Sequence, residues 1–479
     1  MAQAWPKAKP KLTQEAFDEA VSSNIEDFDM SREEAIKSAI EEFNVQGYDL
    51  SGVVTNMAGN DLQSHPIALA CQGLRDACGG QGSLPEALEA LSTSLQASTS
   101  ESSGGGSGGV GGGSMSQEAS VIAHKGGAMQ SLLEACRQLQ SQTDQLLKAL
   151  KLLQVLLGWL ETRDAFASDA TGVDLLHDLL RAEASTPEVR TAAAAVAEAA
   201  ARQVEEAKCR LVDSGLVATL LEQLQAPEAP LEYVGAACGV VRSVTTADDE
   251  RPPASKAFMH ARVLAKSHAA IRVLLSVLRR VPAATEPATA CRVLATVRQV
   301  AANEEICREF TDDGGVMACL QVLKECAAQR DVCRACLGAL RQLAHSDTVK
   351  RLLAEAGAVG EAVRCVELHA GSDDVAEVAL GLLGNMMLRQ PEICTKAAES
   401  GVPEMVVEAM QRHAPRAPVQ RQACLVVRIM VARNPELRPL FLERGAEALL
   451  RAAKAAHPAS CRDVGSAALR DLGLDNYND

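Results

Sequence analysis

Aromatic residues are scarce in this 479-residue chain, where seven Phe, three Tyr and two Trp make up 3% of the sequence. Alanine and leucine dominate instead, which favours helices packed through small side chains and excludes an all-β fold. Long apolar runs are also missing, since none approaches the ~20 residues of a membrane span. With 47% hydrophobic and 23% charged residues, the composition predicts a globular chain with a buried core.

Positive charge is in deficit as well. The chain has 47 Lys and Arg against 62 Asp and Glu, a net charge of -15. Because phosphate-backbone binding needs a concentrated basic face, we expect no nucleic-acid partner. The first eleven residues lack the apolar segment of a secretory signal, so we expect a cytoplasmic or nuclear protein without membrane contact.

The residues that usually carry chemistry are present but scattered. The fifteen cysteines form no framework and are expected to be small buried hydrophobes in a reducing compartment. Cys333 and Cys336 are the closest pair, yet they occur at helical intervals rather than in the turns of a zinc ribbon. The nine histidines form no HExxH pair. We therefore expect no metal, no cofactor and no enzymatic activity.

The N-terminal segment is strongly acidic. Between Leu12 and Leu50, eleven acidic residues face only Arg32 and Lys37, a local net charge of -9. Apolar residues recur at helical spacing in two sets, and the second follows Ser31-Arg32-Glu33-Glu34, which has the form of a capping box. The pattern predicts two short acidic helices, with these apolar positions: Phe17, Val21 and Ile25, then Ile36, Ile40 and Phe43.

A glycine- and serine-rich tract, SSGGGSGGVGGGS, occupies residues 102–114. It has no side chains to bury, so we expect a flexible linker. The predicted organisation is an acidic arm over residues 1–64, a helical lead-in and partial first repeat over 65–101, the linker, and a repeat array over 115–479. An insertion interrupts the array at about residues 246–266.

The array repeats one pattern, in which a short helix ends before a glycine and a Leu- or Val-rich helix follows. The junction glycines are spaced 45, 43, 100, 42, 44 and 44 residues apart, and they are Gly127, Gly172, Gly215, Gly315, Gly357, Gly401 and Gly445. The step of 100 covers two repeats plus the insertion, with the missing junction expected at residues 267–270. Glycine suits this junction because it permits a left-handed backbone conformation.

A third, nearly all-apolar helix closes each repeat, as in VCRACLGALRQL at residues 332–343. Three helices per ~44 residues are typical of the armadillo or HEAT class. We therefore predict an all-α fold, a right-handed α-solenoid of about eight armadillo-type three-helix repeats preceded by an acidic helical N-terminal arm.

Several phrases carry a family resemblance. The GxxxLL junctions and the ACxxxR third helices resemble armadillo repeats. LTQEAFDEAVSSNIEDF, IEEFNVQGYDL and the C-terminal AALRDLG resemble the family of armadillo repeat-containing protein 6 over nearly the whole chain. The resemblance implies an intracellular armadillo superhelix without known enzymatic activity. The chain departs from the family in its Gly/Ser tract and its alanine-rich second repeat.

Armadillo solenoids line a concave groove with their third helices, so the resemblance directs attention to polar residues there. Counting back 16 or 17 residues from each following junction glycine locates the same place in successive helices, occupied by Arg298, Arg341, Asn385 and Arg428. Arg242 has the like place in its own helix, whereas the first two repeats have Gly158 and Glu198. Guanidinium groups offer five donors and no acceptor, which suits carbonyls and carboxylates.

This arginine row has two interpretations. Either it binds an extended or helical, acidic segment of a partner, or each arginine forms an ion pair with the neighbouring repeat. The first predicts a scaffold or adaptor. An alternative is a carrier or chaperone-like protein whose groove is regulated by intramolecular contact with the acidic arm. The insertion, with Asp248, Asp249 and Glu250, is expected to be an exposed loop followed by helix, without the spacing of a calcium site.

Overall fold

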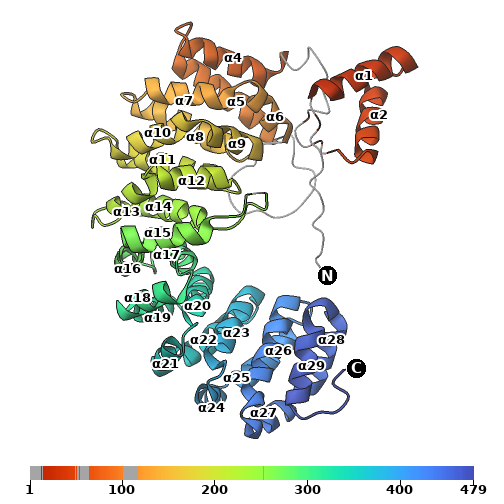
Figure 1. Cartoon of the computed structure of the whole chain (residues 1–479), viewed down its shortest axis with the longest axis vertical. Helices are drawn as coiled ribbons and strands as arrows, with labels where there is room; N and C mark the ends of the chain where they lie inside the picture. Colours follow the sequence, from red (N-terminus) through yellow and green to blue (C-terminus); the bar gives the residue numbers. More distant parts are fainter. Residues whose placement is uncertain are drawn as a thin grey trace. The chain divides into compact units, whose positions relative to one another are not determined.

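The computed structural model describes residues 14–48, 64–100, 117–251 and 253–478, together with residues 12, 50 and 53. All regular elements in these ranges are helices (Figure 1). The chain divides into two compact units: unit 1 comprises residues 1–219 and 247–255, and unit 2 comprises residues 220–246 and 256–479. The Gly/Ser tract at 102–114 lies outside the described residues.

The acidic arm is a helical hairpin of α1 (Gln14–Phe28) and α2 (Arg32–Val45). The predicted capping box is confirmed, because the Ser31 side chain accepts from the Glu34 amide and the Glu34 carboxylate accepts from the Ser31 amide. Phe17 and Val21 are buried with Ala35 and Ala39 in a core of the hairpin's own. Ile25 is partly exposed, at 38%.

Unit 1 continues with a helical pair and then with three-helix repeats. Its helices are α4 (Pro66–Cys78), α5 (Leu84–Ser100), α6 (Gln117–Lys125), α7 (Ala128–Gln138), α8 (Thr143–Leu156), α9 (Leu160–Ser168), α10 (Ala170–Arg181), α11 (Pro187–Ala201) and α12 (Glu205–Asp213). The third helices α8 and α11 pack on each other. The boundary between the units falls within α13 (Leu216–Gln223).

Unit 2 repeats the same three-helix plan. Its helices are α14 (Leu231–Val244), α15 (Ala257–His268), α16 (Ala270–Arg280), α17 (Pro287–Val300), α18 (Glu304–Asp312), α19 (Gly315–Glu325), α20 (Arg330–Leu343), α21 (Asp347–Glu355), α22 (Ala358–Leu368), α23 (Asp373–Met387), α24 (Pro391–Glu399), α25 (Val402–Arg412), α26 (Ala417–Ala432), η1 (Pro435–Leu437), α27 (Arg438–Leu442), α28 (Ala446–Ala456) and α29 (Pro458–Asp471). The predicted all-α solenoid of armadillo-type repeats is confirmed.

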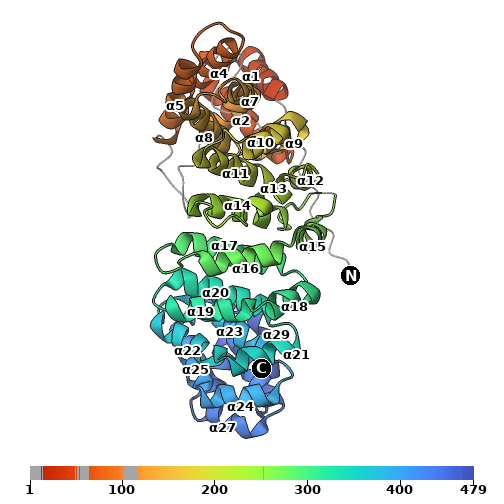
Figure 2. The same ribbon diagram turned by 90° about the vertical axis from the view of Figure 1, so that its left-hand side faces the viewer.

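The third helices of unit 2 form one continuous layer. Each of α14, α17, α20, α23, α26 and α29 packs on the next (Figures 1 and 2). Their shared sides are fully buried aliphatic residues and cysteines, such as Leu337, Cys336 and Val427. Burying such side chains on both sides of a helix stabilises each repeat through its neighbours. The remaining side of the layer holds the arginine row.

The junctions between first and second helices show why glycine recurs. Six glycines have left-handed φ angles between 72° and 85°: Gly127, Gly215, Gly314, Gly357, Gly401 and Gly445. Ala269 takes this conformation (φ 49°) at the junction without glycine, within the residues where the spacing locates it. An alanine there carries strain that glycine avoids.

Two of the seven expected junction glycines have a different role. Gly314, not Gly315, takes the left-handed turn before α19, and a Cβ on Gly315 would lie 2.3 Å from the Phe310 ring. Gly172 lies inside α10, where a Cβ would lie 2.7 Å from the ring of Phe166. Both glycines therefore make room for an aromatic ring of the preceding helix rather than for a left-handed backbone.

The insertion is shorter than the sequence suggests. Residues 257–268 form α15, which is the first helix of a repeat, so only residues 247–256 are extra. The exposed loop is part of unit 1 and α15 belongs to unit 2.

The cysteines lie where small apolar side chains would. All fifteen are free thiols, twelve of them buried and three half-buried. Burial raises the pKa of the Cys136 and Cys319 thiols to about 12 and keeps them as uncharged thiols. Within the described ranges, no helix is both long enough and apolar enough to span a membrane.

Candidate partner-binding face

Three of the predicted groove residues meet at one hollow of unit 2. Arg298 on α17, Arg341 on α20 and Asn385 on α23 line a pocket of about 480 Å³, here called the α20 pocket. Glu377 is the single acidic residue among the described residues that line it. The pocket thus gathers two guanidinium groups and one carboxylate along three successive third helices.

Glycine in the following helix makes room for each arginine. A Cβ on Gly381 would lie 2.5 Å from Cζ and Nη1 of Arg341, closer than real atoms approach, so the guanidinium rests directly on the α23 backbone. Glycine inside a helix costs about 1 kcal/mol relative to alanine. Glycine is needed at position 381 because the Arg341 guanidinium occupies the space of a Cβ. Arg298 lies more loosely over Gly338, where Nη1 is 3.6 Å from the position of a Cβ.

The arginines differ in their partners. Among the described residues, the guanidinium groups of Arg298 and Arg341 have no hydrogen-bond or ion-pair partner. Arg428 does have one, because its Nε lies 3.3 Å from the Asp471 carboxylate on α29. The residues of the row therefore differ in their contacts. Arg428 makes the inter-repeat ion pair, whereas Arg298 and Arg341 line the pocket.

Asn385 belongs to a second row that the sequence reasoning missed. Its Nδ2 donates to the Arg341 carbonyl on the preceding third helix, at 3.1 Å. Gln342 donates in the same way to the Ala301 carbonyl and Gln299 to the Thr245 carbonyl, both at 2.7 Å. These three amides are 43 residues apart, a spacing that could have revealed the row. Each amide satisfies a carbonyl near the end of the preceding helix.

The remaining predicted positions do not line the α20 pocket. Arg242 is an exposed residue of α14 and lies outside this pocket. In unit 1, Glu198 is buried at 3% exposure, and its carboxylate lies 3.5 Å from the guanidinium of Arg202, the residue after α11. Gly158 follows the end of α8. In the structure, the row of predicted residues that line the face therefore starts at Arg298.

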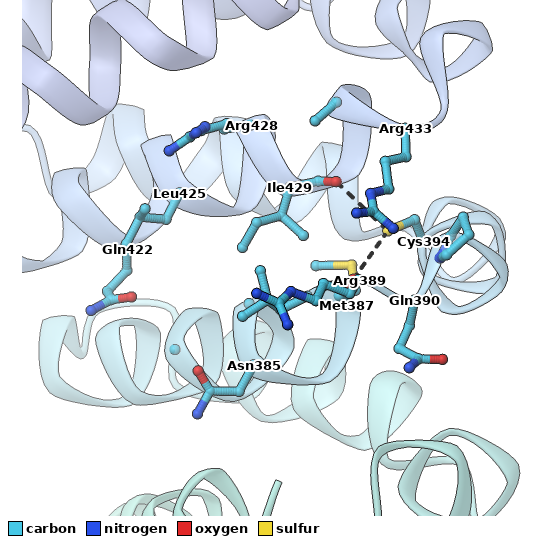
Figure 3. A pocket seen from close by; sticks show the side chains of 15 residues that line it. Asn385, Met387, Arg389, Gln390, Cys394, Gln422, Leu425, Arg428, Ile429 and Arg433 are labelled. Carbon is cyan, nitrogen blue, oxygen red and sulfur yellow. Dashed lines mark hydrogen bonds between the residues drawn. The ribbon is translucent and has the colours of Figure 1, made fainter. Parts of the chain in front are cut away.

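A second pocket, here called the α26 pocket, lies between α23 and α26 and has a volume of about 420 Å³. Asn385 lines both this pocket and the α20 pocket, so the two adjoin each other. Figure 3 shows Arg428 of α26 and Arg433, which directly follows α26, on one side of the pocket and Arg389, which follows α23, on the other. Its apolar lining includes Leu388, Leu425 and Ile429.

Arg389 has an unusual backbone conformation. Leu388 (φ -60°, ψ 114°) and Arg389 (φ 63°) form a tight turn, closed by the Gln390 amide donating to the Met387 carbonyl at 2.9 Å. These angles are those of a type II turn, whose third position favours glycine or asparagine. An arginine there costs about 1 kcal/mol of backbone strain. The cost makes Arg389 a candidate functional residue that the sequence pattern did not single out.

The loop of residues 247–255, here called the clamp loop, is bound tightly to unit 1. Asp248 forms an ion pair with the fully buried Lys208, and Asp249 accepts from the Glu205 amide at the start of α12 at 2.9 Å. Arg251 bridges Asp249 and Asp164, at 2.8 Å from each. Most described residues of the loop are exposed and a helix follows it, as the sequence predicts, but two of its three acids hold the fold together.

The Asp249 carboxyl is held ionised by these contacts. Burial alone would raise its pKa, but hydrogen bonds from the Arg251 side chain and from the backbone amides of Glu205 and Arg251 outweigh it and lower the pKa to about 2. The same contacts raise the pKa of Arg251. Because Val204 supplies no side-chain cap, Asp249 takes over the capping of α12.

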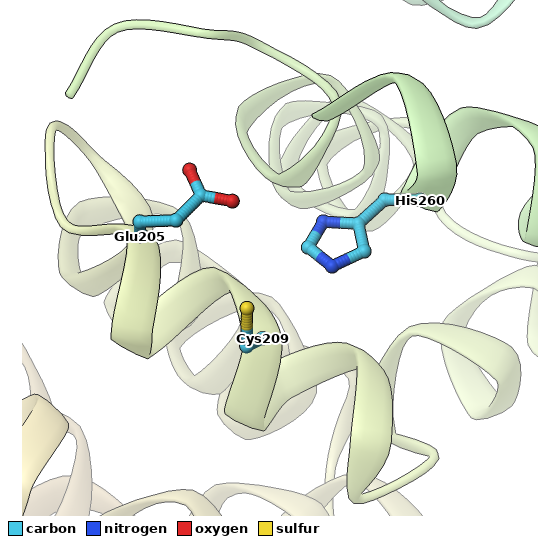
Figure 4. A group of neighbouring side chains, drawn as sticks. All are labelled: Glu205, Cys209 and His260. Atoms are coloured by element: carbon cyan, nitrogen blue, oxygen red, sulfur yellow. The ribbon is translucent and has the colours of Figure 1, made fainter. Parts of the chain in front are cut away.

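Three further residues that could act as ligands have structural contacts within their own units. Glu205 and Cys209 occupy one side of α12, and His260 lies on α15 (Figure 4). The Ser255 hydroxyl donates to Glu205 at 3.2 Å within unit 1. Within unit 2, Nδ1 of His260 lies 2.9 Å from the Val244 carbonyl. These contacts account for the buried carboxylate and imidazole.

Sequence comparisons agree with this architecture. Residues 9–68 match the family model described as the armadillo repeat-containing protein 6 N-terminal domain. Human armadillo repeat-containing protein 6 is 28% identical over 397 residues, covering 80% of this chain and 75% of the relative. The Drosophila melanogaster homologue is 25% identical over 386 residues, 80% of this chain and 78% of the relative. The chain is thus similar in sequence to armadillo repeat-containing protein 6 over about four fifths of its length.

Solved structures show the same fold. An engineered protein superposes with a TM-score of 0.62 at 17% identity, covering 96% of this chain and 99% of the other. A structure reported with the phosphorylation-controlled interaction between cadherin and β-catenin gives a TM-score of 0.58 at 16% identity, with 96% of both chains covered. At these identities the similarity establishes the armadillo fold and no more.

Proposed function

We propose that this protein is a non-catalytic scaffold or adaptor that binds an acidic, extended or helical protein segment on the third-helix face of unit 2. The face comprises the α20 and α26 pockets, from Arg298 to Arg433. The sequence predicts that this face is the concave surface of the solenoid.

One observation carries the proposal: Arg298 and Arg341 lack a counter-ion among the described residues, in a protein of net charge -15. A side chain that only packed the fold would gain by pairing with one of the many acids, as Arg428 does with Asp471. Carboxylates or carbonyls of a bound segment would supply the missing acceptors through charge-assisted hydrogen bonds. The structural neighbour reported with cadherin and β-catenin supports a protein segment as the class of partner.

The test compares matched charge removals. Acidic, neutral and basic degenerate peptide libraries are passed over the immobilised full-length chain, its Arg298→Gln/Arg341→Gln variant and its Arg462→Gln variant. We expect the unmodified chain to retain the acidic library preferentially, and the double variant to lose about tenfold or more of that retention. Arg462→Gln is the control, since this exposed arginine of α29 lines neither pocket of the face. Equal retention of the acidic library by all three proteins contradicts the proposal.

The acidic arm supports a second candidate, a carrier or chaperone-like protein whose groove the arm regulates. The α1–α2 hairpin has a hydrophobic core of its own, so it is suited to act as a tethered, competing acidic ligand. In this case deleting residues 1–60 raises the affinity for the acidic library. An unchanged affinity and unchanged amide exchange of α17, α20 and α23 contradict this regulation.

The proposed location is the cytoplasm, the nucleus or both. Fifteen free thiols, most of them buried, suit a reducing compartment. Fractionation of cells that express the tagged full-length chain tests this location, and recovery in the secretory pathway contradicts it.

A further inference from the structure

The α26 pocket combines features that the scaffold function alone does not require. Among the described residues that line it, none is acidic, whereas three are arginines. Arg428 is paired with Asp471. Arg389 and Arg433 are exposed, and neither guanidinium has a hydrogen-bond or ion-pair partner in the described part of the chain. The pocket therefore presents two uncompensated positive charges.

The backbone at both arginines is fixed by its local hydrogen bonds. Arg389 occupies the left-handed position of the turn between α23 and α24, where glycine would be favoured. Arg433 follows α26 directly and precedes Asn434, which is buried and donates to the Pro391 carbonyl at 3.2 Å. Backbone strain at an arginine that has no hydrogen-bond or ion-pair partner among the described residues is of the kind found at binding sites.

The surroundings define the kind of group that fits. Leu388, which is 47% exposed, lines the pocket with Leu425 and Ile429. Gln422 adds an amide donor. An oxyanion with several acceptor oxygens, placed beside an aliphatic side chain, would satisfy both parts of this lining.

We propose that the α26 pocket is a subsite for a phosphorylated serine or threonine of the bound segment. Two unpaired guanidinium groups match the charge of about -2 on a phosphorylated side chain, whereas a carboxylate would neutralise only one. Arg389 and Arg433 bind the phosphate oxygens, and the aliphatic wall receives a neighbouring apolar side chain. The proposal rests on the proposed function, because it names the anionic group that the acidic segment carries at this end of the face.

The experiment uses the full-length chain and three degenerate peptide libraries with phosphoserine, glutamate or serine fixed at the centre. We expect the phosphoserine library to be retained at least tenfold more than the serine library and severalfold more than the glutamate library. Arg389→Gly relieves the backbone strain, so it should lower phosphoserine retention about tenfold while the melting temperature stays equal or rises. Arg433→Gln should lower retention similarly, and Arg462→Gln, an exposed arginine of α29 outside the pocket, should leave it unchanged.

Two results overturn the subsite. One is equal retention of the glutamate and phosphoserine libraries, which assigns the pocket to a carboxylate. The other is wild-type retention of phosphoserine by both Arg389→Gly and Arg433→Gln. Either leaves the proposed function intact if retention of acidic peptides still depends on Arg298 and Arg341. If the Arg298→Gln/Arg341→Gln variant retains acidic peptides as well as the unmodified chain does, the proposed function itself is wrong.

Discussion

The clamp loop of unit 1 and the third-helix face of unit 2 are both rich in charge, yet they use it in opposite ways. Asp248, Asp249 and Arg251 of the loop all form ion pairs or hydrogen bonds with unit 1. Arg298 and Arg341 of the face have no such partner among the described residues. Charge that is satisfied internally stabilises a fold, whereas unsatisfied charge held in place is available to a ligand. The comparison predicts that the two regions respond differently to mutation.

Reversing charge on the face should have the largest effect. Arg298→Glu/Arg341→Glu is expected to lower retention of acidic peptides at least 100-fold and to create retention of basic peptides, because two acids then line the α20 pocket beside Glu377. Binding to peptide libraries and the melting temperature are the measurements. A fall of several degrees in the melting temperature, with acidic peptides still bound, would assign these arginines to the fold.

Removing the capping carboxylate of the clamp loop should affect stability alone. Asp249→Ala is expected to cost about 1–2 kcal/mol of local stability, because the α12 amide loses its cap. The measurement is hydrogen exchange of the α12 amides, with the exposed Glu250→Ala as control. Unchanged exchange in Asp249→Ala would show that the loop contacts contribute nothing.

The Asp249 carboxylate also makes the local stability of α12 depend on pH. Asp249 has a pKa of about 2 in the folded chain and about 3.9 when unfolded. A lowered folded pKa gives stability that is present above about pH 4 and is lost as the pH falls toward about 2. The difference in α12 protection between the unmodified chain and Asp249→Ala should therefore narrow as the pH falls below about 4. A difference that stays constant over this range would contradict the assigned cause.

A smaller effect is expected from Gly381→Ala, which moves an arginine without removing charge. The new methyl group would occupy the space of the Arg341 guanidinium, while alanine favours the helix by about 1 kcal/mol. We expect acidic-peptide retention to fall severalfold with little loss of stability. Gly338→Ala is the matched control, since its Cβ would make only ordinary contact with Arg298. Equal effects of the two substitutions would argue against an ordered Arg341.

The smallest effect is expected at Arg428. Its side chain is 43% exposed, so Arg428→Gln should change the free energy of unfolding by at most about 1 kcal/mol. Asp471→Asn should cost at least as much, since Asp471 also pairs with Arg470 at 2.9 Å, and adding Arg428→Gln to it should cost nothing more. A chemical denaturation series measures this cycle. Additive losses in the double variant would mean that the two side chains do not act as a pair.

Spacing in the sequence was sufficient for the repeats and for most junctions, including the one at Ala269 that has no glycine. It could not distinguish Gly314 from Gly315, because either glycine fits the interval and only the Phe310 ring decides between them. At Gly172, too, the spacing does not reveal that the Phe166 ring occupies the space of a Cβ. A glycine can be required by backbone conformation or by close packing, and sequence alone does not separate the two.

The candidate site was predicted less completely. The interval located Arg298 and Arg341 on one face, but it placed Asn385 in their row although its contacts match those of Gln299 and Gln342. The pairing of Arg428 could have been anticipated, since Asp471 follows it by one repeat of 43 residues. Arg389 could not, because its importance lies in a φ angle that the local sequence does not favour.

The most direct test of the central claim is hydrogen exchange of the full-length chain with and without a peptide selected from the acidic library. If the third-helix face binds the segment, protection should increase in α17, α20, α23 and α26 and should be absent in the Arg298→Gln/Arg341→Gln variant. Protection confined to the first helices α18, α21 and α24, or equal in both proteins, would contradict the account.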